Sequence, residues 1–66
     1  MPNDCRELWL IQEYNSGSHL SAILNGGATL KLNIHPSKGL YYKTRNDATV
    51  EIISLGINAV AVKKPR

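Results

Sequence analysis

Apolar and polar residues alternate through residues 40–63, and this alternation constrains the fold more than any other feature of the 66-residue sequence. Side chains alternate between the two faces of a strand, so shifting a hairpin by one residue exchanges its faces. A three-residue loop at residues 46–48 sorts the two kinds of side chain, because it places Tyr42 opposite Ile52. A two-residue loop mixes them. The sequence therefore predicts a hairpin with the longer loop.

The next turn, at residues 56–58, leads to the same interpretation. A three-residue loop there pairs Ile52 with Val62 and Glu51 with Lys63 across two further strands. One face of the predicted three-stranded unit is then apolar and forms the core: Leu40, Tyr42, Val50, Ile52, Val60 and Val62. The opposite face is basic, with one aromatic ring: Tyr41, Lys43, Arg45, Glu51, Ile53 and Lys63.

Residues 19–34 predict a second hairpin, because Asn25-Gly26 is a strong short-range hairpin signal. A three-residue loop at residues 25–27 pairs Leu20 with Leu32, Ala22 with Leu30 and Leu24 with Ala28. The alternative is a short helix over residues 18–25 that ends at Gly26.

Residues 7–14 are rich in β-branched and aromatic side chains and favour a strand, with a helix capped by Asp4 and Glu7 as the alternative. The predicted fold is all-β: a five- or six-stranded antiparallel meander that curls into a small barrel. Residues 1–66 form a single domain in this interpretation, with residues 1–6 as an N-terminal tether and residues 64–66 as a frayed basic tail.

Composition indicates the cellular compartment and the oligomeric state to expect for this domain. The single cysteine, Cys5, excludes an internal disulfide and fits a reducing compartment. No apolar run approaches the length of a membrane span, and a basic signal-peptide flank is absent. We therefore expect a cytoplasmic protein with no membrane partner, of bacterial, plasmid or phage origin. A chain this short buries little apolar surface, which favours a homo-oligomer.

Residues that carry chemistry are few. Cys5, His19 and His35 lack the spacing of a nucleophilic or metal site, and two surface imidazoles without a further ligand bind metal weakly. No phosphate-binding glycine loop or pair of carboxylates is present. We expect no catalytic residues, no metal and no cofactor, and hence a protein that is not an enzyme.

Charge is distributed unevenly along the chain. Residues 31–66 carry seven Lys or Arg against Asp47 and Glu51, a net charge of +5, whereas residues 1–30 carry −2. Cations that neutralise phosphates, next to an exposed tyrosine that stacks on a base, are typical of nucleic-acid interfaces. We expect a small regulator that binds RNA or single-stranded DNA through one sheet face. Its predicted binding residues are Tyr41, Lys43, Arg45, Lys63, Lys64 and Arg66.

The alternative function is a protein–protein interaction module. It is an accessory protein of a phage or plasmid that binds a host protein, or a protein that binds itself. It depends on apolar side chains that a monomer of this size leaves uncovered, and an exposed apolar patch is typical of an interaction site. The residues predicted for this surface are Trp9, Ile11, Ile23 and Ile53.

Residues 48–65 resemble the middle strands of the carbon storage regulators, which are small dimeric RNA-binding β proteins. The resemblance is carried by alternating valines in ATVEIISLGINAVAVKKP. The opening of this chain lacks that family's first strand and its following Gly-Glu, so no family is assigned.

Overall fold

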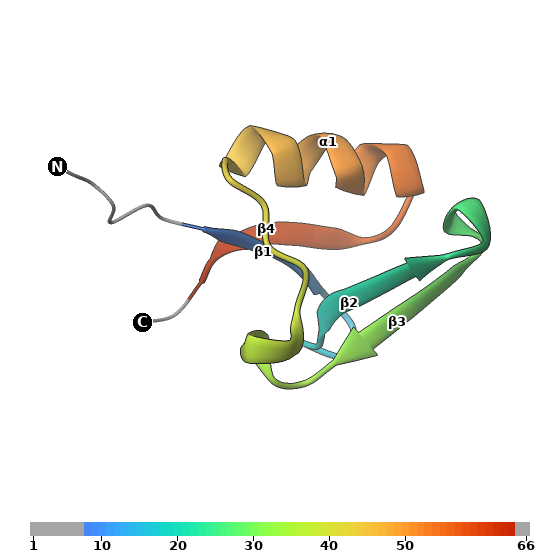
Figure 1. The fold of residues 1–66 in the computed structure, drawn as a ribbon, viewed down its shortest axis with the longest axis horizontal. Coiled ribbons are helices and arrows are strands. Elements are labelled where there is room, and N and C mark those ends of the chain that lie inside the picture. The colour runs from blue at the N-terminus through green and yellow to red at the C-terminus, as the bar shows by residue number, and fades with distance from the viewer. Residues whose placement is uncertain (1–7, 65–66) are drawn as a thin grey trace, which may run out of the picture.

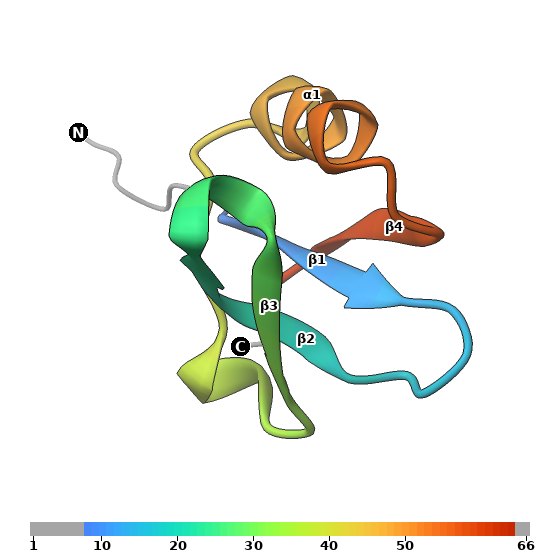
Figure 2. The ribbon, with the colours of Figure 1, turned by 90° about the vertical axis from the view of Figure 1, so that its right-hand side faces the viewer.

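The computed structural model describes residues 8–64, which form one curled sheet with a helix over part of it (Figures 1 and 2). The strands lie in the order β3-β2-β1-β4, and every neighbouring pair is antiparallel. The elements in chain order are β1 (Trp9–Glu13), β2 (His19–Leu24), the 3-10 turn η1 (Asn25–Gly27), β3 (Thr29–Asn33), the 3-10 turn η2 (Pro36–Lys38), α1 (Arg45–Leu55) and β4 (Ala59–Lys63).

The predicted β class is confirmed in its coarse form, since the described chain is mostly an antiparallel sheet that curls into a half-barrel. The sheet has four strands where five or six were predicted. Strands occur where predicted at β1, β2, β3 and β4, and the alternative helix over residues 18–25 is wrong because β2 occupies that stretch. The predicted tether at residues 1–6 lies outside the described residues.

The largest error concerns residues 40–55, where the two predicted strands are replaced by α1. The side chain of Thr44 accepts a hydrogen bond from the Asp47 backbone N–H at 3.0 Å and so caps the first turn. Gly56 ends the helix with φ of 67°, and its N–H donates to the carbonyls of Ile52 and Ile53. Capping at both ends, together with packing of one helix face on the sheet, therefore outweighs the alternation that suggested strands.

The face of α1 that meets the sheet carries Ala48, Ile52 and Leu55, which belong to the core cluster. Val50, predicted to lie in the core, is 56% exposed on this helix. A helix places residues three and four apart on one side, whereas the prediction used every second residue. The predicted cross-strand pair of Glu51 with Lys63 is consequently wrong as well, because Lys63 pairs with Trp9.

The register of β4 on β1 sets which side chains lie beneath α1. Ile11 pairs with Ala61, and Leu10 pairs with Val62. Ile11, Ala59 and Ala61 belong to the core cluster under the helix, so Val62 faces the other side of the sheet. The prediction that Val60 and Val62 share a face with Ile52 is therefore wrong. The small alanine side chains let the helix lie close to the strand.

The β2–β3 hairpin keeps the predicted pair Leu20–Leu32 and then departs from the predicted register. A bulge between Leu20 and Ala22 makes Ala22 pair with Lys31, and Ile23 with Leu30. The extra residue, Ser21, donates its hydroxyl to the Lys31 carbonyl at 3.1 Å. The bulge changes the phase of the alternation and turns Ile23 toward the core.

Strands β1 and β2 pair only at Gln12–His19 and then separate, and residues 40–42 lie in the gap. The Leu40 N–H donates to the Leu20 carbonyl at 2.9 Å. Tyr42 exchanges two backbone hydrogen bonds with Trp9, each of 2.8 Å. This segment therefore satisfies backbone groups that the splayed strands would leave unpaired.

The first prediction of the fold concerns the helix cap. Thr44→Ala removes the side-chain acceptor at the start of α1, and we expect it to lower the free energy of unfolding by about 1 kcal/mol in urea titrations. Thr44→Ser keeps the acceptor and should restore most of the loss. Thr49→Ala, the same substitution inside the helix, should cost nothing, because alanine has the higher helix propensity. Equal losses for Thr44→Ala and Thr49→Ala would contradict the capping role.

A second prediction concerns Gly39, which has ordinary backbone angles but no room for a side chain. A Cβ atom there would lie 2.6 Å from Leu10 Cδ2 and 3.4 Å from the Leu20 carbonyl oxygen. We expect Gly39→Ala to destabilise the fold by about 1–3 kcal/mol, measured by chemical unfolding. In a Leu10→Ala background the same substitution should cost clearly less, because the obstructing methyl group is gone. An undiminished cost in that double mutant would argue against this contact.

Candidate nucleic-acid interface

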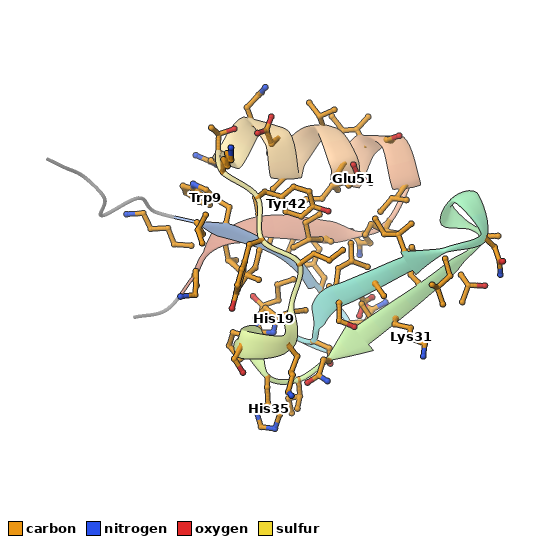
Figure 3. All side chains as sticks on the ribbon, viewed as in Figure 1. Trp9, His19, Lys31, His35, Tyr42 and Glu51 are labelled. Atoms are coloured by element: carbon orange, nitrogen blue, oxygen red, sulfur yellow. The ribbon has the colours of Figure 1, made fainter. Side chains whose placement is uncertain are left out.

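The predicted cations that the structure describes gather at one end of the sheet, around Trp9 at the start of β1. Lys63 of β4 pairs with Trp9 on one side, and Tyr42 bridges Trp9 on the other. Figure 3 shows Trp9 and Tyr42 near the first turn of α1. We call this region the basic end and define it by the following residues: Tyr41, Lys43, Arg45, Lys63 and Lys64.

Tyr41 and Lys64 form the best-defined contact of the basic end. The Lys64 Nζ atom lies 5.4 Å from the centroid of the Tyr41 ring, a cation–π geometry. The Tyr41 hydroxyl donates to the Ser37 carbonyl at 3.4 Å, and the Lys64 N–H donates to the Leu8 carbonyl at 2.7 Å. Each partner is thus attached to a different part of the fold. The ring nonetheless remains 42% exposed.

The hydrogen bond from Lys64 to Leu8 extends the contact between β4 and β1 by one residue beyond the strand. The predicted frayed tail thus begins with a residue whose backbone is hydrogen-bonded, and the rest of it lies outside the described residues. Arg66, the last predicted binding residue, lies outside them too.

The basic end differs from the single sheet face that the sequence predicted. Lys43 lies in the connection after the Tyr42 bridge, and Arg45 is the first residue of α1. Tyr41 and Tyr42 are neighbours in an extended segment, so their side chains point to opposite sides of the sheet. The predicted residues therefore come together around an end of the sheet and not on one of its faces.

Two acidic side chains, Glu51 and Glu13, lie outside the basic end. Figure 3 places Glu51 of α1 close to Tyr42. Burial raises the pKa of the Tyr42 hydroxyl, and the negative charge of Glu51 raises it further. At the far end of β1, hydrogen bonds from Ser16 hold the pKa of the Glu13 carboxyl below its ordinary value. Glu13 is thereby engaged in the β1–β2 turn, away from the basic end.

The residues predicted for protein interaction are mostly part of the core. Ile11 is 1% exposed, and Trp9 and Ile23 are half-buried against the same cluster. The predicted exposed surface is therefore wrong for Ile11, whereas Trp9 and Ile23 are covered in part and Ile53 is 74% exposed on α1. The sequence reasoning missed other large exposed apolar side chains: Tyr14, Leu24, Leu32, Ile34 and Val50.

The two histidines do not form a surface pair. His19 is 8% exposed, and its Nδ1 atom is buried without a hydrogen-bond partner, whereas His35 is exposed before η2. The expectation that both are surface histidines is wrong for His19. Within residues 8–64 no group of three or more His, Cys, Asp or Glu side chains could hold a metal ion. Cys5 lies outside the described residues.

One signal in the sequence could have located Arg45 and the approach to it. Thr44 and Asp47 have the spacing of a helix N-terminus, and Gly56 has the spacing of its end. Weighing these caps above the alternation would have placed Arg45 in the first helical turn. No comparable local signal marks the bridge between Trp9 and Tyr42, which joins distant parts of the chain.

Within residues 8–64 no helix is long and apolar enough to cross a membrane.

The raised pKa of Tyr42 predicts a loss of stability at alkaline pH. A phenol whose pKa is higher in the folded state favours folding fully below the unfolded pKa of about 10. That contribution is lost as the pH rises from there through the folded value. We expect urea midpoints to fall with pH in this range, and to fall less for Tyr42→Phe. Tyr14→Phe, which removes the hydroxyl of an exposed tyrosine, is the control and should follow the unmodified protein. Identical alkaline slopes for Tyr42→Phe and the unmodified protein would contradict the assignment.

Comparison of the chain with models of protein families, with curated proteins and with solved structures found no match.

Proposed function

We propose that this chain is a small non-enzymatic regulator that binds RNA or single-stranded DNA at its basic end. The observation that carries the proposal is the Tyr41–Lys64 pair, in which an exposed ring lies beside an ammonium group. A nucleotide offers the complementary elements, a base that stacks on a ring and a phosphate that binds an ammonium group. Lys43, Arg45 and Lys63 add positive charge around the pair.

Charge supports binding to the nucleic-acid backbone. All four cations of the basic end are exposed side chains, while Asp47, in the first turn of α1, is the nearest acid in sequence to Arg45. Lysine and arginine bind phosphates with release of counterions, without regard to base sequence. Binding through this end should therefore be general and strongly dependent on salt.

The ring supports a preference for unpaired strands. Lys64 lies against the Tyr41 ring, so a base that stacks there competes with the ammonium group or uses the other face of the ring. Bases in a duplex are stacked on each other and have no free face. Tyr41 thus favours RNA loops or single-stranded DNA, and Lys64 is positioned to bind the adjoining phosphate.

The proposal predicts a salt-dependent affinity that falls when the basic end is altered. Fluorescence anisotropy with short labelled RNA, single-stranded DNA and duplex DNA measures the affinity across a salt series. The logarithm of the binding constant falls linearly with the logarithm of the salt concentration. Each lost phosphate contact should reduce the magnitude of this slope by about 0.7 on single strands. We expect Lys43→Glu with Arg45→Glu to lower it by about 1.4, and Tyr41→Ala to weaken single-strand binding by about 1–3 kcal/mol.

Matched controls separate this site from general positive charge. Lys31→Glu makes the same charge change on β3, away from the start of α1 (Figure 3), and should reduce the slope less than Lys64→Glu. Tyr41→Phe keeps the ring and should bind as the unmodified protein does. An affinity that is unchanged by Lys43→Glu with Arg45→Glu would refute the proposal. So would equal effects of Lys31→Glu and Lys64→Glu.

A further inference from the structure

The outer edge of β3 is open within residues 8–64. This strand stands last in the sheet order, and Figure 1 shows no element along its outer side. An exposed edge presents unpaired backbone N–H and C=O groups to any strand that approaches. Its only charged side chain is Lys31, and no proline interrupts it before Pro36. Natural protection of this edge is therefore slight.

Exposed apolar side chains accompany the open edge. Leu30 packs partly against the core cluster, Leu32 is 43% exposed, and Ile34, two residues further, is 70% exposed. Alternation along the strand places Leu30 and Leu32 on the face that carries the core. The core thus continues to the rim of the half-barrel, where nothing within residues 8–64 covers it.

We propose that a second copy of this chain pairs with the edge of β3 in antiparallel fashion, about a two-fold axis at Leu32. In this register Leu32 meets its own copy and Lys31 meets Asn33. Leu30 meets Ile34, which lies in the bend after β3 and extends the paired strand by one residue. The apolar side chains of both copies then form one continuous face. Lys31 lies opposite a neutral amide on the other face.

The sequence of β3 selects this register over its neighbours. An axis at Lys31 places two lysines directly opposite each other, which is destabilising. An axis at Leu30 leaves Ile34 uncovered and pairs Leu32 with the small side chain of Ala28. An axis at Asn33 sets Leu30 against Pro36, which cannot donate to a ladder. An axis between two residues sets Lys31 or Asn33 against leucines and mixes the faces. Self-complementarity in a single register is the argument for a second copy over an unrelated strand.

The interface is small compared with the surface of the chain, which totals 4487 Å². Stable complexes bury roughly 800 Å² on each partner, more than one short strand edge supplies. We therefore expect a reversible dimer with a Kd of roughly 10–100 μM. The inference does not rest on the proposed function, because the argument for it uses none of the residues of the basic end.

Sedimentation equilibrium across protein concentration tests the pairing, with three single substitutions. Ile34→Lys lies on the edge and is already exposed in the monomer, so it should weaken the dimer at least tenfold without loss of fold. Ile53→Lys makes the same change at a similarly exposed site on α1 and should leave the dimer unchanged. Circular dichroism on the same samples verifies that each variant is folded.

A substitution that adds a negative charge at position 33 should strengthen the dimer instead of weakening it. Asn33 Oδ1 accepts a hydrogen bond from the His35 N–H at 2.9 Å, and an aspartate at this position keeps that acceptor. Asn33→Asp sets a negative charge opposite the partner's Lys31 twice in the symmetric dimer. It should tighten association by about 2- to 30-fold.

Several results would overturn the inference. They are a monomer throughout the concentration range, dissociation by Ile53→Lys, and a dimer that Ile34→Lys and Asn33→Asp leave unchanged. The last two results would move the interface to the outer face of α1 or to the edge of β4. Oligonucleotide binding by the Ile34→Lys monomer separates the two proposals, because the basic end is intact in this variant.

Discussion

The structure depends on the burial of β1 on both faces. Leu10 is fully buried on one face, and Ile11 is 1% exposed on the other. A sheet of four short strands covers neither face by itself, so each face needs a separate cover. Helix α1 covers Ile11, and the turn around Gly39 closes over Leu10. Both covers come from the connection between β3 and β4.

That connection explains why β1 and β2 separate. Residues 40–42 follow the turn over Leu10 and lie along β1, where they bond to Trp9 and to Leu20 of β2. The segment then delivers the chain to the start of α1. A closed ladder between β1 and β2 would exclude it, since the same backbone groups would already be paired. The sheet therefore stays a half-barrel, because the segment that leads to α1 occupies the place of a continuous β1–β2 ladder.

Strands β1 to β4, the Leu20–Leu32 pair and the grouping of Tyr41, Lys43 and Arg45 could be predicted from the sequence, because these features depend on residues close in the chain. The bulge at Ser21 and the bridge between Trp9 and Tyr42 could not. Neither has a local sequence signature, and each becomes favourable only when distant segments meet. A register predicted from strict alternation is wrong by one residue beyond a bulge. Leu30 therefore pairs with Ile23 and not with the predicted Ala22.

Helix α1 was misread for a different reason. Its Thr49, Val50, Ile52 and Ile53 are β-branched and have modest helix propensity, so residues 49–53 favour a strand when considered alone. Tertiary packing of Ala48, Ile52 and Leu55, with caps at Thr44 and Gly56, reverses that preference. Val50 and Ile53, which contributed to the apparent alternation, are exposed on the outer side of the helix. Tyr41, Lys43 and Arg45 are close in the chain and stay near one another in either conformation, so their grouping does not depend on this error.

The basic end and the open edge of β3 lie at different places in the sheet, and this separation has a physical consequence. β3 and β4 occupy opposite ends of the strand order, so pairing through β3 leaves Lys63 and Lys64 of both copies uncovered. A dimer would then present two basic ends to one polyanion. When a strand is long enough to reach both, the second contact is intramolecular and benefits from a high effective concentration. Weak pairing at β3 and weak phosphate binding at each end would then reinforce each other, because a strand bound at both ends also holds the two copies together.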